Sequence, residues 1–234
     1  MIEAFVDNLG KYTKGNPGGE WITFPASQED VKKLFSKIGV DGVLYEEIII
    51  TDYKTDVDGL DFDEYAHLDE LNYLAALIDD MDDWEIEKFE AAIAYGEYTR
   101  SVKDLINLTQ NLDNYEFYSG VENEKQLGEY LVHELDYEQI PERLQGYFDY
   151  EAYGDDHAIN EGGVFINGGG YVEHNHGSHI EHYGGRDNIP DEYKIFAYPD
   201  PPEKMPIKQQ LEMYAKMMIA PAAERLTPAR EERG

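Results

Sequence analysis

The chain has 234 residues, a formal net charge of −31 at pH 7 and no cysteine, so disulfides and thiolate metal sites are excluded. No apolar run reaches the ~20 residues that a membrane-spanning helix needs, and the N-terminus lacks the pattern of a signal peptide. We therefore expect a cytoplasmic protein with no membrane partner.

Residues 1–62 are predicted to form a small α+β domain. A serine followed three positions later by an aspartate indicates a helix start at Ser27, and Gly39 indicates its end. Alternating and β-branched residues predict strands on both sides of this helix. The expected strands cover residues 2–7, 21–24 and 43–53.

Residues 63–113 are predicted to be all-helical. Apolar residues recur there at helical spacing, so each helix buries one face. The expected helices cover residues 68–79 and 84–95, and a third begins at Ser101.

The stretch 61–90 is the most acidic part of the chain, with twelve acids and one lysine for a net charge of −11. Like charges three or four residues apart on a helix cost stability, so we interpret these acids as a surface that is presented to a binding partner. DNA also displays regular negative charge, about one per 1.7 Å of axis. We predict a DNA-like surface that meets a DNA-binding protein, without direct nucleic-acid binding. Its residues are Asp61, Asp63, Glu64, Asp69, Glu70, Asp79, Asp80, Asp82, Asp83, Glu85, Glu87 and Glu90.

Other interpretations of the charge remain open. Residues 1–173 hold 11 basic and 40 acidic residues, for a net charge of −29, whereas residues 174–234 hold 8 and 10, for −2. This uneven distribution argues against a general adaptation to high salt. An acidic binding module or chaperone for another basic protein is the alternative function. An EF-hand alignment on Gly59 fails, because Lys54 and Tyr65 fall where calcium needs carboxylates.

Residues 114–173 return to mixed structure. We expect a strand at 115–118, a helix at 124–135, and a hairpin from 163–167 and 171–173. A further helix from Pro141 is expected to carry Leu144, Tyr147 and Phe148.

Residues 174–234 are predicted to be a His/Gly-rich linker followed by an amphipathic helix at 206–219. Four histidines are weak metal-ligand candidates, but no regular element places them all on one side, which favours a flexible polar tail. Truncation after Glu173 is therefore expected to leave a folded, active protein. The four histidines are His174, His176, His179 and His182.

The sequence shows no phosphate-binding loop, zinc-protease pair or nucleophile elbow. We expect a protein that is not an enzyme and holds no cofactor.

Two stretches of the sequence resemble motifs of the ArdA antirestriction family. The first is Asn8-Leu9-Gly10-Lys11-Tyr12-x-x-Gly15 with Trp21-Ile22-Thr23-Phe24-Pro25. The second is the antirestriction motif, Ile140 to Gly154, and Glu70-Leu71-Asn72 also fits. The likeness covers about residues 2–173.

The resemblance implies a homodimeric DNA mimic from a mobile element. Such proteins occupy the DNA-binding groove of type I restriction-modification enzymes, chiefly the methyltransferase core. It also implies an α+β fold made of an elongated chain of three small domains (α+β, all-helical, α+β) at 1–62, 63–113 and 114–173. The dimer contact is expected in the last of these, where Asp155 replaces the family's usual arginine. Motif residues with a possible dimer role are Leu144, Tyr147, Phe148, Asp149, Tyr150, Glu151, Tyr153 and Gly154.

Overall fold

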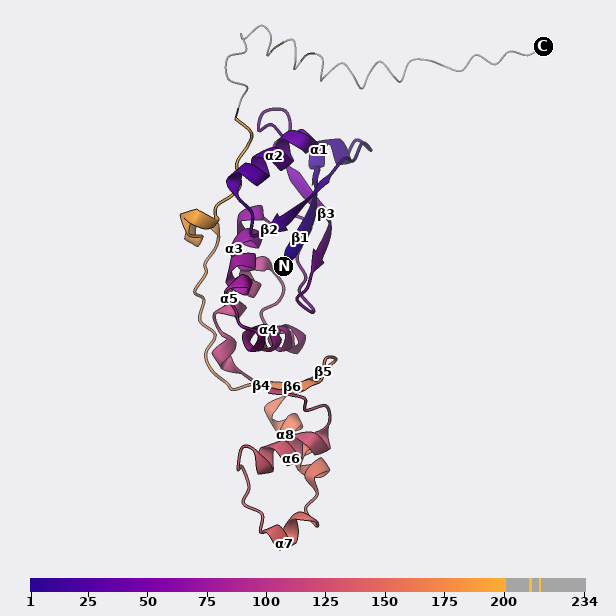
Figure 1. The fold of residues 1–234 in the computed structure, drawn as a ribbon, viewed down its shortest axis with the longest axis vertical. Helices are drawn as coiled ribbons and strands as arrows, with labels where there is room; N and C mark the ends of the chain where they lie inside the picture. The colour runs from indigo at the N-terminus through magenta and orange to yellow at the C-terminus, as the bar shows by residue number, and fades with distance from the viewer. Residues whose placement is uncertain (201–210, 212–214, 216–234) are drawn as a thin grey trace, which may run out of the picture. The chain divides into compact units, whose positions relative to one another are not determined.

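Two small antiparallel sheets and eight α-helices make up the described part of the computed structural model, which covers residues 1–200, 211 and 215 (Figure 1). The α+β class is as predicted. The chain divides into two compact units, residues 1–198 and 199–234, and every element below lies in the first. The division into three domains stays a prediction. One hydrophobic core joins the first sheet, the middle helices and part of the second sheet.

The first sheet has the order β2-β1-β3. Alternation along β1 buries Ile2, Ala4 and Val6 on the face that α2 covers. The Ser27–Asp30 capping box starts α2, and Gly39 ends it in the left-handed conformation at φ 74°. The elements are β1 (Ile2–Asn8), α1 (Leu9–Tyr12), β2 (Glu20–Phe24), α2 (Gln28–Ile38) and β3 (Ile48–Thr55).

The third strand begins at Ile48, five residues later than predicted. The Oδ1 atom of Asp41 accepts hydrogen bonds from the N–H groups of Val43, Leu44 and Tyr45 at 2.8–3.1 Å. Although burial alone would raise the pKa of Asp41, these N–H groups hold it below its ordinary value. The side chain thus holds a turn where β-branched residues had suggested a strand.

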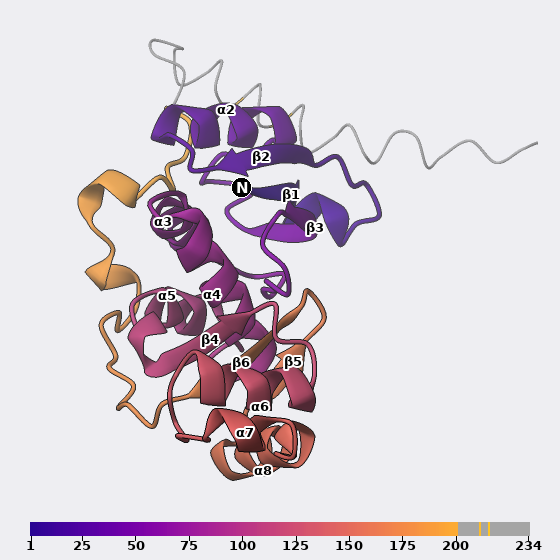
Figure 2. The ribbon, with the colours of Figure 1, turned by 60° about the horizontal axis from the view of Figure 1, so that its bottom comes forward.

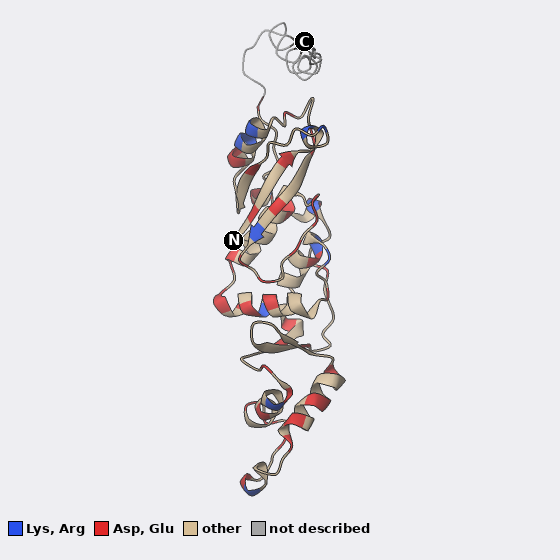
Figure 3. Cartoon of the chain, turned by 90° about the vertical axis from the view of Figure 1, so that its right-hand side faces the viewer, with Lys and Arg blue, Asp and Glu red and all other residues tan. Residues whose placement is uncertain are grey.

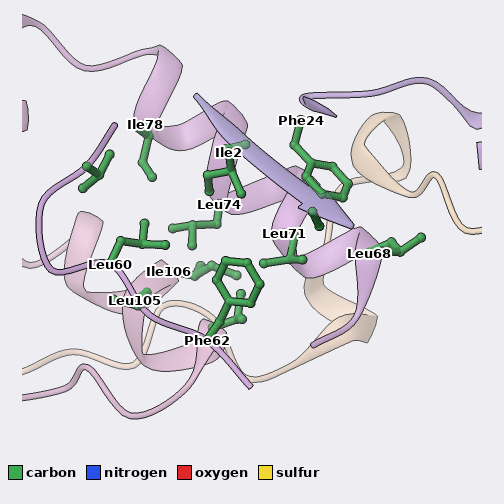
Figure 4. Close-up of a cluster of buried hydrophobic side chains, with 14 of the residues drawn as sticks. Ile2, Phe24, Leu60, Phe62, Leu68, Leu71, Leu74, Ile78, Leu105 and Ile106 are labelled. Atoms are coloured by element: carbon green, nitrogen blue, oxygen red, sulfur yellow. The ribbon is translucent and has the colours of Figure 1, made fainter. Parts of the chain in front are cut away.

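Three helices form the middle of the unit, and their positions confirm the sequence prediction to within a residue or two. Their apolar faces meet residues of the first sheet and of the following loop in one core (Figure 4). Side chains of α3, α5 and β1 point toward one another there. The helices are α3 (Leu68–Asp79), α4 (Asp83–Tyr95) and α5 (Val102–Thr109).

The second sheet has the order β4-β6-β5, and its β5–β6 hairpin is as predicted. Two helices, α6 and α8, pack together beside it (Figure 2). Gly128 and Gly154 lie where these helices cross, since a Cβ on either would meet the main chain of the other helix. The elements are β4 (Tyr115–Ser119), α6 (Glu124–His133), α7 (Glu142–Gln145), α8 (Tyr150–Glu161), β5 (Val164–Ile166) and β6 (Gly170–His174).

The segment that follows Pro141 forms two helices. The prediction of a single helix that carries Leu144, Tyr147 and Phe148 was therefore wrong. The first, α7, ends at Gln145, before Tyr147 and Phe148. Asp149 then caps α8, because its Oδ1 atom accepts a hydrogen bond from the N–H of Ala152 at 3.1 Å. The antirestriction motif is therefore a short helix, a turn and the start of a longer helix.

Residues 175–198, here called the strap, pack on the body, whereas the sequence suggested a flexible polar tail. The side chains of Tyr183, Ile189 and Ile195 are only 1–2% exposed. Apart from two short 3-10 turns, η2 (Arg186–Asn188) and η3 (Asp191–Tyr193), the strap is irregular. It runs beside α5 and α3 in both ribbon views (Figures 1 and 2).

The predicted helix at 206–219 lies outside the described residues, apart from positions 211 and 215. Within the described part of the chain, no helix is long and apolar enough to cross a membrane.

Candidate acidic interaction surface

Acidic residues occur in both sheets and in most helices. Several successive turns of α4 carry one (Figure 3). The twelve acids predicted to form the displayed surface fall in the loop before α3, in α3, in the α3–α4 turn and in α4. The structure divides them by what their carboxylates contact.

The two acids in the first turn of α3 are bonded to the strap. The Oδ1 atom of Asp69 accepts hydrogen bonds from the N–H groups of Ile195 and Phe196 at 2.7 and 2.6 Å. The Oε1 atom of Glu70 accepts one from the hydroxyl of Tyr183 at 2.9 Å. Burial, with the hydrogen bond to Glu70, raises the pKa of Tyr183. Both carboxylates are half-buried, so they hold the strap in place.

Two acids at the start of α4 form a capping box. The Asp82 carboxylate accepts a hydrogen bond from the N–H of Glu85 at 2.9 Å, and the Glu85 carboxylate accepts one from the N–H of Asp82 at 3.0 Å. Acids at this end also meet the positive end of the helix dipole, which offsets part of their mutual repulsion. The carboxylates of Asp82 and Glu85 therefore stabilise the start of α4.

Four further acids contact nearby groups. Glu90 accepts a hydrogen bond from the N–H of Asp58, Asp63 accepts one from the N–H of Tyr65, and Asp61 accepts one from the hydroxyl of Tyr53. Burial and the bond to Asp61 raise the pKa of Tyr53. Glu64 is hydrogen-bonded to the Tyr65 side chain, which raises the pKa of that hydroxyl.

The remaining four acids, here called the open acids, are exposed and make no hydrogen bond or ion pair within the described residues. They lie at the end of α3, in the α3–α4 turn and in the first half of α4, and they are Asp79, Asp80, Asp83 and Glu87. Trp84 lies among them with half its surface exposed and its ring centroid 5.5 Å from that of Phe117. Unpartnered carboxylates on a well-packed helix can accept charge-assisted hydrogen bonds from arginine or lysine.

The antirestriction motif residues fall into two sets. Tyr147 is 88% exposed and Leu144 is 46% exposed. The ring of Phe148 instead lies edge-on to Tyr150 and Tyr153, with centroids 5.0 and 5.4 Å away. Within the motif, Gly154 is buried against α6, Asp149 caps α8, and Glu151 is exposed.

Of the four histidines considered as metal ligands, His174 ends β6 and the other three lie in the strap. His174 and His176 contact each other, since the Nδ1 atom of His174 accepts a hydrogen bond from the N–H of His176 at 3.0 Å. His174 lies edge-on to Tyr115, His176 contacts the Glu161 carboxylate at 3.2 Å, and His179 stacks on Tyr98 with centroids 3.6 Å apart. His182 is exposed. In the described part of the chain, no group of three or more histidine or acidic side chains could hold a metal ion.

A buried polar cluster in the second sheet was not anticipated from the sequence. Glu173, 6% exposed, contacts the Nε2 atom of His157 at 2.8 Å and accepts a hydrogen bond from the hydroxyl of Tyr118 at 3.1 Å. These contacts tie α8 to β6. The sequence feature that could have predicted this cluster is the strand period of two, which places Glu173 on the same face as Tyr171.

One family model matches the chain, and its description is Antirestriction protein (ArdA). The match covers residues 4–173. It contains the two sheets apart from the first two residues of β1 and the last residue of β6, all eight α-helices of the described residues and the open acids, and it ends just before the strap. No curated protein matches the chain.

Proposed function

We propose, because the chain belongs to the ArdA antirestriction family, that it mimics B-form DNA and occupies the DNA-binding groove of a type I restriction-modification enzyme. The family gives the antirestriction function. The mimicry, the methyltransferase core as the contact and the protection of incoming mobile DNA are our proposal. The protein acts by occupancy and catalyses no reaction.

The observation that carries this proposal is the set of open acids. Two of them, Asp83 and Glu87, lie on α4, whose other face is buried through Phe89, Ala92 and Ile93. Asp79 ends α3, and Asp80 follows it in the α3–α4 turn. A rigid support keeps charged groups at fixed spacing, as the sugar-phosphate backbone does for phosphates. A groove that binds DNA offers lysine and arginine side chains, and these can pair with the open acids in place of phosphates.

The proposal includes a homodimer formed through the antirestriction motif. Leu144 and Tyr147 are exposed apolar side chains in and after α7, and a second copy would cover them. Gly154 serves the packing of α8 on α6 within one chain. Leu144 and Tyr147 are therefore the motif residues that we assign to the dimer contact.

The alternative function, an acidic module for another basic protein, uses the same open acids. A pull-down of a purified type I methyltransferase core separates the two. We expect the protein to retain the methyltransferase and duplex DNA to release it. Retention that is undiminished at saturating duplex DNA would contradict mimicry. Equal retention of an unrelated basic protein that does not bind DNA would favour the alternative.

A further inference from the structure

The strap is held mainly by side chains of the body, as a bound peptide is held by its receptor. It pairs with no strand. Apart from the N–H of Asn175, which donates to the C=O of Asn114 at 2.8 Å, its backbone–backbone hydrogen bonds are confined to short turns such as Tyr193 N–H to Pro190 C=O. The side chains that hold it come mainly from α3, from α5 and from Asn111 just after α5, more than 60 residues earlier in the sequence.

Two asparagines, Asn107 of α5 and Asn111 just after the end of α5, each hydrogen-bond both main-chain groups of one strap residue. The Asn107 side chain donates to the C=O of Tyr183 at 2.9 Å and accepts from its N–H at 2.8 Å. Asn111 does the same with Ile180, at 2.9 Å for both bonds. The two asparagines are four residues apart in the sequence and are 3% and 5% exposed. Each side-chain amide thus donates to the C=O and accepts from the N–H of one residue, as the main chain of a neighbouring β-strand would.

The other end of the strap meets α3 in a related way. The side chain of Asn72, 2% exposed, donates to the C=O of Tyr193 at 3.0 Å. Asp69 accepts from two successive strap N–H groups, those of Ile195 and Phe196. Main-chain recognition therefore occurs at both ends of this contact.

Apolar anchors accompany these main-chain contacts. Tyr183 and Tyr193 of the strap flank Tyr73 of α3, with ring centroids 6.0 and 5.2 Å from it. Phe196 lies between Phe35 and His67, at 5.2 and 5.1 Å. Main-chain bonds with intervening side-chain anchors are how proteins recognise an extended peptide.

We propose that the face formed by α3 and α5 is a binding site for an extended polypeptide, recognised through its main chain, and that residues 178–196 are its resident ligand. The tether keeps the strap at high effective concentration, so the site is normally filled from within the same chain. When the strap leaves, Asp69 and Glu70 lose their partners and join the exposed acids. The site thus controls how many carboxylates the protein displays.

The test uses the full chain and a labelled synthetic peptide with the sequence of residues 177–198. A weak-strap variant, carrying Tyr183→Ala and Ile195→Ala, retains the whole α3–α5 face. We expect the peptide to bind the weak-strap variant and not the unchanged chain, whose site is filled. Adding Asn107→Ala and Asn111→Ala to the weak-strap variant should lower peptide affinity at least about tenfold, because four hydrogen bonds are lost.

Peptide binding that is equal with and without the asparagines would overturn the proposal. So would absence of binding to a weak-strap variant that stays folded. Should that variant unfold, hydrogen exchange on the full chain with Asn111→Ala decides. We expect the amide of Ile180 to lose protection while the β1 amides keep theirs. Unchanged protection at Ile180, or an equal loss everywhere, contradicts the proposal.

The matched control is Ile180→Ala. Its side chain is 56% exposed and only its main chain is held, so this change should leave strap protection unaltered. A loss of protection as large as that caused by Asn111→Ala would show that side-chain packing holds this residue, against the proposal.

Discussion

The first turn of α3 and the region around the start of α4 are both acidic in sequence and differ in what their carboxylates contact. Asp69 and Glu70 accept hydrogen bonds from strap residues more than 110 positions away. Asp79, Asp80 and Asp83 face solvent without a partner within the described residues. An acidic helix therefore carries charges of two kinds, and only tertiary contacts distinguish those that hold the fold from those free to meet another protein.

The largest effect should come from removing the strap. Truncation after Glu173 exposes the surface that Tyr183, Ile189 and Ile195 cover, and each well-buried side chain contributes about 1.5–3 kcal/mol. That loss is large against a typical stability of about 5–15 kcal/mol. We expect a strongly lowered melting temperature, measured by circular dichroism.

Truncation after Asp200 is the matched control, because it keeps the whole strap. It should melt close to the full chain. Equal melting temperatures for the two truncations would mean that the strap adds little, and the original expectation of a dispensable tail would stand.

Charge reversal at the open acids should weaken partner binding and spare the fold. Exposed ion pairs are each worth about 0–1 kcal/mol, so replacing Asp79, Asp80, Asp83 and Glu87 with lysine should cost roughly 1–4 kcal/mol of binding. That is about a five- to thousand-fold loss of affinity for the methyltransferase core. Asp82 is left unchanged because it caps α4.

A control for net charge reverses the charge of two residues, either among the open acids or on the strap. Asp79→Lys with Asp83→Lys changes the charge as much as Asp187→Lys with Glu192→Lys on the strap. Only the first pair should reduce binding markedly. Similar losses from both pairs would mean that total charge matters and position does not.

Single alanine substitutions compare the contribution to stability of an acid bonded to the strap with that of an open acid. Asp69→Ala leaves two strap N–H groups without their acceptor, and an unsatisfied buried donor costs about 1–3 kcal/mol. Asp80→Ala removes an exposed side chain and should change stability by less than about 0.5 kcal/mol. Urea denaturation measures both, and equal effects would contradict the division of the acids.

The smallest effect expected is an alkaline loss of stability. Burial raises the pKa of Tyr183 above its ordinary value of 10.0. A raised pKa means that the stabilising contribution is complete below about pH 10 and is lost as pH rises beyond it. Chemical denaturation from pH 8 to 11 should show this decline, and Tyr183→Phe should make it shallower. An unchanged decline in that variant would assign the effect to other buried tyrosines.

Much of the fold was predictable because its signals are local. The Ser27 and Ser101 caps, the periodic apolar faces of α3 to α5 and the glycine-rich β5–β6 turn each follow from short spacings. The strap was not predictable. Its buried residues recur at no helical or strand period, and its partners lie far away in the sequence.

The candidate site was predictable in part for the same reason. Composition located the acidic stretch, and the resemblance in sequence agrees with the family match. Which acids are bonded depends on the strap and on the loop before α3. Spacing within a helix carries no information on those contacts. The start of α8 was missed although Asp149 is a typical capping residue, because the aromatic run suggested one continuous helix.

The central claim, that the open acids stand in for phosphates, is tested most directly by the salt dependence of binding. Affinity for a type I methyltransferase core should fall steadily from ~50 to ~300 mM salt, because ion pairs are screened and counterions are released. A variant with Asp79→Asn, Asp80→Asn, Asp83→Asn and Glu87→Gln should show a shallower slope. A flat profile for the unchanged chain, or the same slope for both proteins, would contradict the account.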